Sequence, residues 1–404
     1  MSLTRVVSAV PSIADRRLLA YAGYHAPEWL LDRLDPAVVS GIAKPLIHAA
    51  ADQQFVARAA AKGLITALPG EAWRNQLAPE DKRRLALKPL DYMLDARADP
   101  SETRLSDPAI SEYAATYVDA QISRGATLIG TPAHVHRVDG DVGRDNDLRL
   151  AEAAVAEWEG RQGSRERPDG RPTALFATVA VNAAALTNPD FVTWLVRQYL
   201  ALRVDGFWIA VFNSRHGLAQ LQGATRLGLG LQSDGRFAIL SGVGDAHLAA
   251  LARGLAATCA GHHGMAPSFP PADLPTDEDD DTPMGVPIYH PAIMGSTALG
   301  DDWEPARRAL FRRNPCPCGR HAADQVPDGR AKREHNLEML LHEAAAAIAL
   351  DPLDAATVFK RRSKAARTLR ASLEIGDLKP GWRGAASARA WNDDAGSIGI
   401  AEAG

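Results

Sequence analysis

Two of the three cysteines lie one residue apart in a proline-rich turn, and this is the stretch best suited to metal chemistry. Cys316 and Cys318 are followed by His321 within the segment Asn-Pro-Cys-Pro-Cys-Gly-Arg-His, and His335 opens a helix-like run to Leu350. Zinc takes four thiolate or imidazole ligands in a tetrahedron. The sequence therefore predicts a structural Zn²⁺ site made of Cys316, Cys318, His321 and His335, with His342 as an alternative fourth ligand. The alternative interpretation is a pair of ordinary loop thiols beside surface histidines.

A second residue able to do chemistry is Asp95, which ends the segment Lys88–Asp95. This segment is predicted to be a short buried strand, and active sites of parallel barrels gather at the carboxyl ends of their strands. Asp95 is therefore a candidate catalytic residue. A helix cap or a turn residue is the alternative interpretation.

A third feature is a cluster of positive charge near the C-terminus, in the helical segment Phe359–Arg367. The chain as a whole has a net charge of −4, so any polyanion must be met by a local patch of this kind. We predict contact with a nucleic-acid backbone through the basic side chains of this segment, and a merely solvated helix face is the alternative. These side chains are Lys360, Arg361, Arg362, Lys364 and Arg367.

The elements that must position these residues alternate between apolar strands and amphipathic helices. Continuous apolar runs indicate parallel strands that are covered on both faces, and several such units in series favour a closed eight-stranded (β/α)8 TIM-type barrel. A doubly wound open sheet is the alternative, but no glycine-rich phosphate loop follows the first predicted strand. The predicted strands after Lys88–Asp95 are 125–130, 173–181, 205–212 and 236–240, and the predicted helices are 106–124, 146–159, 189–202 and 246–254.

The domain organisation follows from shifts in composition along the chain. Residues 1–85 are predicted to be mostly helical and to be part of the barrel or packed on it, with helices at 27–34, 37–51 and 52–61. Residues 86–310 are the predicted barrel core and residues 311–350 the zinc-binding subdomain. Residues 351–404 are predicted to be a basic helix followed by a loosely ordered tail.

Composition also indicates in which cellular compartment the protein is expected. Cys259 is isolated, so the three cysteines do not form a disulfide framework, and a reducing compartment is expected. The longest apolar stretch, residues 173–186, is too short for a membrane span, and the N-terminus lacks an apolar signal segment. We expect a cytoplasmic protein with no membrane association.

Taken together, these stretches resemble the tRNA-guanine transglycosylase superfamily. Its zinc signature, Cys-x-Cys-x-x-Cys followed by a His-Asn-Leu helix, is similar to Cys316 to His321 with His335-Asn336-Leu337, although His321 replaces the third cysteine. The segment Leu240–Gly244 is similar to the family's Leu-Met-Gly-Val-Gly loop. The resemblance implies base exchange in a nucleic acid, tRNA or DNA, where one Asp attacks the sugar and a second, matched by Asp95, acts in proton transfer. It also implies Ser241, Gly242 and Gly244 as substrate-binding residues, and Asn213 is added as a polar group able to bind a base edge.

The chain departs from this family pattern at the nucleophile. Cys259 stands where the family has its attacking Asp, and Ala180 replaces the Gln of the base pocket. Nearby polar residues that could substitute are Asp245, His247, His262 and His263.

Three hypotheses follow from the sequence. The first is a divergent transglycosylase-like enzyme, related to the branch that inserts deazaguanines into DNA. The second is a catalytically inactive, zinc-stapled barrel that binds nucleic acid beside a partner subunit or a second copy of itself. The third is an unrelated barrel enzyme acting on a small metabolite.

Overall fold

The structure is a computed structural model that describes residues 17–22, 29–49, 52–69, 104–136, 141–161, 173–212, 218–243, 247–261, 288–297 and 304–373. Eight parallel strands form a closed barrel in chain order, and β1 pairs with β8 to close it. The predicted barrel class is therefore confirmed. The strands are β1 (Arg17–Tyr21), β2 (Val39–Ala43), β3 (Ile65–Ala67), β4 (Leu128–Gly130), β5 (Ala174–Asn182), β6 (Gly206–Phe212), β7 (Phe237–Ser241) and β8 (Ala257–Gly261).

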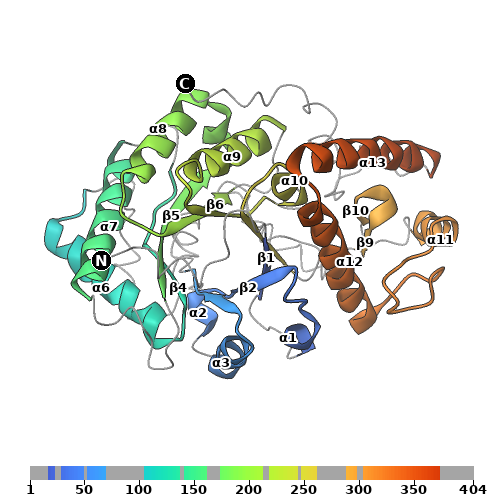
Figure 1. The fold of residues 1–404 in the computed structure, drawn as a ribbon, viewed down its shortest axis with the longest axis horizontal. Helices are drawn as coiled ribbons and strands as arrows, with labels where there is room; N and C mark the ends of the chain where they lie inside the picture. Colours follow the sequence, from blue (N-terminus) through green and yellow to red (C-terminus); the bar gives the residue numbers. More distant parts are fainter. Residues whose placement is uncertain are drawn as a thin grey trace, which may run out of the picture.

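Helices alternate with these strands and cover the outside of the barrel (Figure 1). Two of them begin at capped residues: Ser106 accepts a hydrogen bond from the Ala109 amide, and Asn188 caps the helix that starts at Pro189. The outer helices are α1 (Trp29–Arg33), α2 (Leu46–Ala49), α3 (Gln53–Ala61), α6 (Asp107–Ser123), α7 (Asp141–Gly160), the 3₁₀ helix η4 (Ala183–Thr187), α8 (Pro189–Leu200), α9 (Leu218–Leu231) and α10 (His247–Ala252).

The N-terminal region differs from its predicted helical character. The predicted helix 37–51 is wrong at its start, because residues 39–43 form β2, and three barrel strands lie before residue 86. Five-residue apolar strands of a parallel barrel have no alternation that separates them from buried helix turns. The predicted strand Lys88–Asp95 lies outside the described residues, whereas the later predicted strands correspond to β4 to β7.

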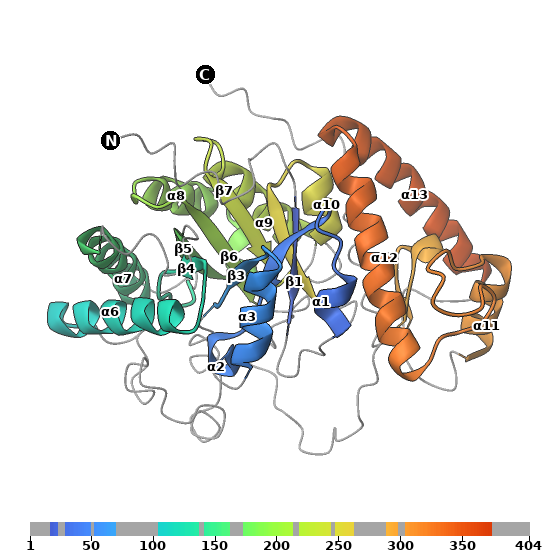
Figure 2. The ribbon, with the colours of Figure 1, turned by 60° about the horizontal axis from the view of Figure 1, so that its bottom comes forward.

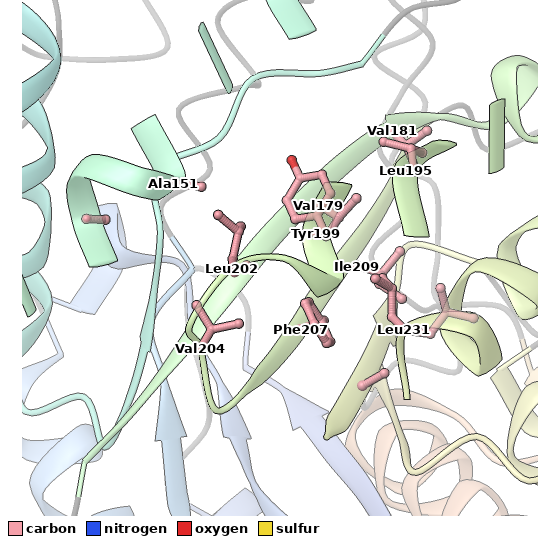
Figure 3. Close-up of a cluster of buried hydrophobic side chains, with 14 of the residues drawn as sticks. Ala151, Val179, Val181, Leu195, Tyr199, Leu202, Val204, Phe207, Ile209 and Leu231 are labelled. Atoms are coloured by element: carbon pink, nitrogen blue, oxygen red, sulfur yellow. The ribbon is translucent and has the colours of Figure 1, made fainter. Parts of the chain in front are cut away.

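The apolar core has two layers, one inside the barrel and one between the barrel and its helices. Figure 3 shows part of the outer layer, where Leu195 of α8 lies beside Val181 and Tyr199 of α8 lies beside Val179. Gly206 allows a close approach between strands: a Cβ atom there would lie 2.5 Å from both the Phe176 ring and the Phe237 carbonyl oxygen. This packing holds the strand ends in fixed positions.

A C-terminal unit follows the barrel and packs against it. Its helix α12 lies between the barrel and α13 (Figure 2), and its apolar residues join those of α10, β1 and β2 in one buried cluster. The unit consists of β9 (Ile288–His290), the 3₁₀ helix η6 (Pro291–Ile293), β10 (Gly295–Thr297), α11 (Glu304–Arg313), α12 (Gly329–Ala349) and α13 (Pro352–Ser372).

Candidate metal centre

The four predicted zinc ligands converge in the C-terminal unit. Cys316, Cys318 and His321 lie on the turn between α11 and α12, and His335 projects from α12. Their ligand atoms all lie within 4.8 Å of one another. The turn closes through a hydrogen bond from the Cys316 amide to the Ala323 carbonyl, and Gly319 takes a positive φ of 67° that suits glycine. The arrangement can hold one metal ion.

The distances around His335 match a tetrahedral ion better than direct hydrogen bonding. Its Nδ1 atom lies 3.3 Å from each of the Cys316 and Cys318 sulfurs and 3.1 Å from His321 Nε2. A tetrahedral zinc with ordinary bond lengths separates a sulfur from a nitrogen by about 3.5 Å. One ring nitrogen has a single lone pair or a single proton and cannot bond to three such neighbours at once.

The second nitrogen of each imidazole fixes its tautomer. His335 Nε2 lies 2.6 Å from the Tyr289 carbonyl oxygen, and His321 Nδ1 lies 2.7 Å from the Ala322 carbonyl oxygen. Because a carbonyl only accepts, these nitrogens carry the protons. The lone pairs of His335 Nδ1 and His321 Nε2 are therefore left to face the two sulfurs, and metal-bound histidines are commonly oriented in this way.

The two thiols differ in their protonation. A hydrogen bond with Cys318, together with burial, raises the pKa of the Cys316 thiol well above its usual range. The same hydrogen bond lowers the pKa of Cys318 to about 3, against the effect of burial. The pair thus shares one proton, and the amides of Cys318 and Arg320 point at the two sulfurs at 3.4 Å. A divalent cation would replace that proton. Its two positive charges would balance the two thiolates, and the two imidazoles would bind it as neutral ligands.

The residue after the histidine ligand strengthens the site. Asn336 Oδ1 accepts a hydrogen bond of 3.0 Å from the Tyr289 amide. His335 and Asn336 therefore bind the carbonyl and the amide of Tyr289 on β9. The ring of Phe311 lies near His335 and His321, with centroids 5.9 and 5.7 Å away. These contacts keep the buried site rigid and apolar on one side.

The choice between His335 and His342 is settled by burial. His335 is 0% exposed and belongs to the cluster, whereas His342 is exposed seven residues further along α12. His335 is therefore the fourth member of the metal centre.

The basic segment 359–367 lies in α13, which runs beside α12. The side chains of Lys360, Arg361, Lys364 and Arg367 are exposed. Arg362 differs, because its guanidinium lies 2.6 Å from the carboxylate of Glu343, a residue of α12 that is 0% exposed. Burial opposes the charge of Arg362, but the hydrogen bond to Glu343 raises its pKa overall. Arg362 therefore joins α13 to α12.

Several residues predicted at the barrel mouth cannot be placed. Asp95, Asn213, Gly244, Asp245, His262 and His263 lie outside the described residues. Ser241 ends β7 and is buried, and Gly242 follows it with a φ of 85°. Cys259 lies on β8 and is 0% exposed among apolar residues of the barrel interior, and His247 begins α10 as a buried residue.

One buried polar network was missed by the sequence analysis. Asp147 of α7 accepts hydrogen bonds from the His134 amide, at 2.6 Å, and from the hydroxyl of Tyr199. Its Oδ2 atom also lies 2.7 Å from Nε2 of His136. The alternating histidines at 134 and 136, directly after a predicted strand, were the only signal in the sequence.

The chain matches no protein-family model and no curated protein in the comparisons made with known proteins. In the part of the chain that the structure describes, no helix is both long enough and apolar enough to cross a membrane.

Proposed function

We propose that this protein is a zinc-stapled barrel that binds nucleic acid, and that it is a divergent relative of the tRNA-guanine transglycosylases. The observation that carries the proposal is the exposed basic face of α13, which is anchored to the helix that holds His335. Lys360, Lys364 and Arg367 follow one another at intervals of four and three residues, so they share one side of the helix.

The anchoring makes this basic face a fixed surface. The buried faces of α12 and α13 share an apolar cluster that includes Phe359, and the Glu343–Arg362 pair ties the two helices together. Phosphate contacts by lysine and arginine release counterions. A row of cations on an already ordered helix makes such contacts at a low cost in conformational entropy.

Cys259 stands at the position where the family has its nucleophilic Asp, and this residue favours nucleic-acid binding over base exchange. Cys259 is fully buried on β8 beside Leu19 and Ala257, and burial in apolar surroundings suppresses thiolate formation. A buried thiol in that setting does not serve to attack a sugar carbon.

The proposal is tested by fluorescence anisotropy with a labelled tRNA and a labelled DNA duplex over a range of salt concentrations. Reversing two charges with Lys364→Glu and Arg367→Glu is expected to weaken binding and to lower the log–log salt slope by about 1.8 for duplex DNA, at about 0.9 per lost phosphate contact. The matched control reverses two exposed arginines on outer barrel helices, Arg197→Glu and Arg226→Glu. Equal binding by both double variants and the wild type would overturn the proposal.

Base exchange is the second candidate function. It is favoured by the similarity of segment 240–244 to the family loop and by the position of Ser241 at the carboxyl end of β7, the end at which barrel enzymes place their substrates. The test offers radiolabelled guanine, with tRNA or duplex DNA, to the wild type and to Asp95→Ala. Incorporation by the wild type that is lost in the variant would support an enzyme, and no incorporation with either nucleic acid would remove this candidate.

A further inference from the structure

Helix α11 presents a second exposed basic face in the C-terminal unit. Arg308, Arg312 and Arg313 are exposed, while Leu310 and Phe311 are fully buried. Arg308 is ion-paired with Glu304, at 2.7 Å, within the first turn of the helix. Arg312 and Arg313 in the last turn have no ion-pair partner among the described residues.

The buried side of α11 is clamped against the metal centre. Phe311 packs edge-on against His290, with ring centroids 4.7 Å apart, and it also contacts the two imidazoles of the metal centre. The residue that follows the helix, Asn314, has its carbonyl oxygen 3.0 Å from His290 Nε2. This clamp fixes the rotation of the helix, so the arginine side faces away from the metal centre.

The same helix meets the C-terminal end of α13. Leu310 packs with Ile293 of η6 and Leu373, and Arg370 of α13 donates a hydrogen bond to the Ile293 carbonyl oxygen. Figures 1 and 2 both show α11 beside that end of α13. The two helices therefore meet at one shared contact, which brings α11 next to the C-terminal end of α13.

Charge is distributed unevenly between this unit and the rest of the chain. Residues 304–373 contain fourteen Lys and Arg and eight Asp and Glu, a net charge of +6. Because the whole chain carries −4, the remaining residues carry −10. A polyanion is attracted to the unit and repelled by the rest, and this asymmetry steers its approach.

We propose that α11 and α13 form one surface for a nucleic-acid backbone, on which Arg312 and Arg313 supply a second row of phosphate contacts. This proposal rests on the proposed function and extends it from a single helix to a two-helix surface. A backbone lying across both helices makes contacts at two separated positions, and each adds to the salt dependence of binding.

The test measures the log–log salt slope of DNA-duplex binding for the Arg312→Gln/Arg313→Gln variant of the full chain. We expect the slope to fall by about 1.8, from two lost contacts, with a thermal midpoint equal to that of the wild type. Arg197→Gln/Arg226→Gln is the matched control and is expected to keep the wild-type slope. When the α11 variant is combined with Lys364→Glu/Arg367→Glu, we expect the two decreases in salt slope to add. The wild type is expected to bind one duplex per chain.

The outcomes separate this proposal from the one on which it rests. If the α13 variant lowers the slope and the α11 variant does not, the second row is overturned and nucleic-acid binding by α13 stands. If neither lowers it, both proposals fail. A decrease with the α11 variant alone, or two duplexes bound per chain, would also overturn the shared surface.

Discussion

Two buried histidine clusters in this molecule look alike in composition but differ in how their polar atoms are satisfied. In the network around Asp147, each carboxylate oxygen faces a donor: the His134 amide at one oxygen, and His136 and Tyr199 at the other. In the metal centre, the unprotonated nitrogens of His335 and His321 face each other and the two sulfurs, and the donors in contact with the sulfurs are one shared thiol proton and the amides of Cys318 and Arg320.

The difference shows how a metal centre can be told from a structural polar network without an ion in view. Both oxygens of the Asp147 carboxylate have donors, although Nδ1 of the buried His136 has no hydrogen-bond partner among the described residues. A cluster whose sulfurs and unprotonated ring nitrogens lie within 4.8 Å of one another can hold a cation at its centre. The first cluster therefore holds α7 and α8 to the segment after β4, and in the second a bound metal would add to the contacts that join α11 to α12.

The largest difference between the two clusters is expected when the histidine ligand on α12 is removed. His335→Ala is expected to abolish stoichiometric zinc and to lower the thermal midpoint strongly, because a structural zinc contributes about 10–16 kcal/mol in small domains. Zinc content and thermal unfolding measure both effects. His342→Ala, seven residues along the same helix, is the matched control and should keep zinc and stability. Full zinc in His335→Ala would show that the cluster is not a metal centre.

The next largest effect is expected at the network that needs no metal. Asp147→Ala leaves the His134 amide, His136 and Tyr199 without their acceptor, and the loss in the free energy of unfolding should be about 3–5 kcal/mol. Denaturant unfolding measures it. Tyr199→Phe removes one donor only and should cost about 1–2 kcal/mol. Zinc content should stay at one per chain in both variants, and a loss of zinc would contradict the independence of the two clusters.

A smaller effect is expected at the ion pair that joins the two regions of the C-terminal unit. Arg362→Ala leaves the buried Glu343 carboxylate without its partner, and because Arg362 is partly exposed we expect the low end of the usual loss, about 3 kcal/mol. The neighbouring exposed residue provides the control, since Arg361→Ala should change stability by less than about 0.5 kcal/mol. Equal stability of the two variants would show that the pair does not hold α13.

The smallest effect is the pH dependence of metal uptake. Since the pKa of Cys316 is raised and that of Cys318 is lowered to about 3, the pair carries one proton at neutral pH. Zinc must displace that proton, so its affinity should rise about tenfold per pH unit near pH 7 and fall as the pH is lowered. Calorimetry in buffers of different ionisation enthalpy should report about one proton released by the thiols. Release of two would contradict the shared proton.

The parts of the fold that could be predicted were those with a strong local signal. Long apolar strands such as β5 and β6, and helices with a cap and an N-terminal proline such as α8, were placed within a few residues. The strand β2 was mistaken for helix because a segment of five residues is too short to carry a period that separates the two structures. The Asp147 network was missed because its members come from three elements and no spacing in the sequence relates them.

For the metal centre, the sequence by itself determined the ligand chemistry: the Cys-x-Cys spacing, the proline and glycine residues of the turn, and a histidine at the start of a helix-like run. It favoured His335 as the fourth ligand and kept His342 as the alternative. Only the tertiary structure decided between them, because the carbonyl that orients the His335 ring belongs to Tyr289, 46 residues earlier on β9. A lone pair faces a metal only when another part of the fold takes the proton at the opposite nitrogen, and local sequence does not encode that partner.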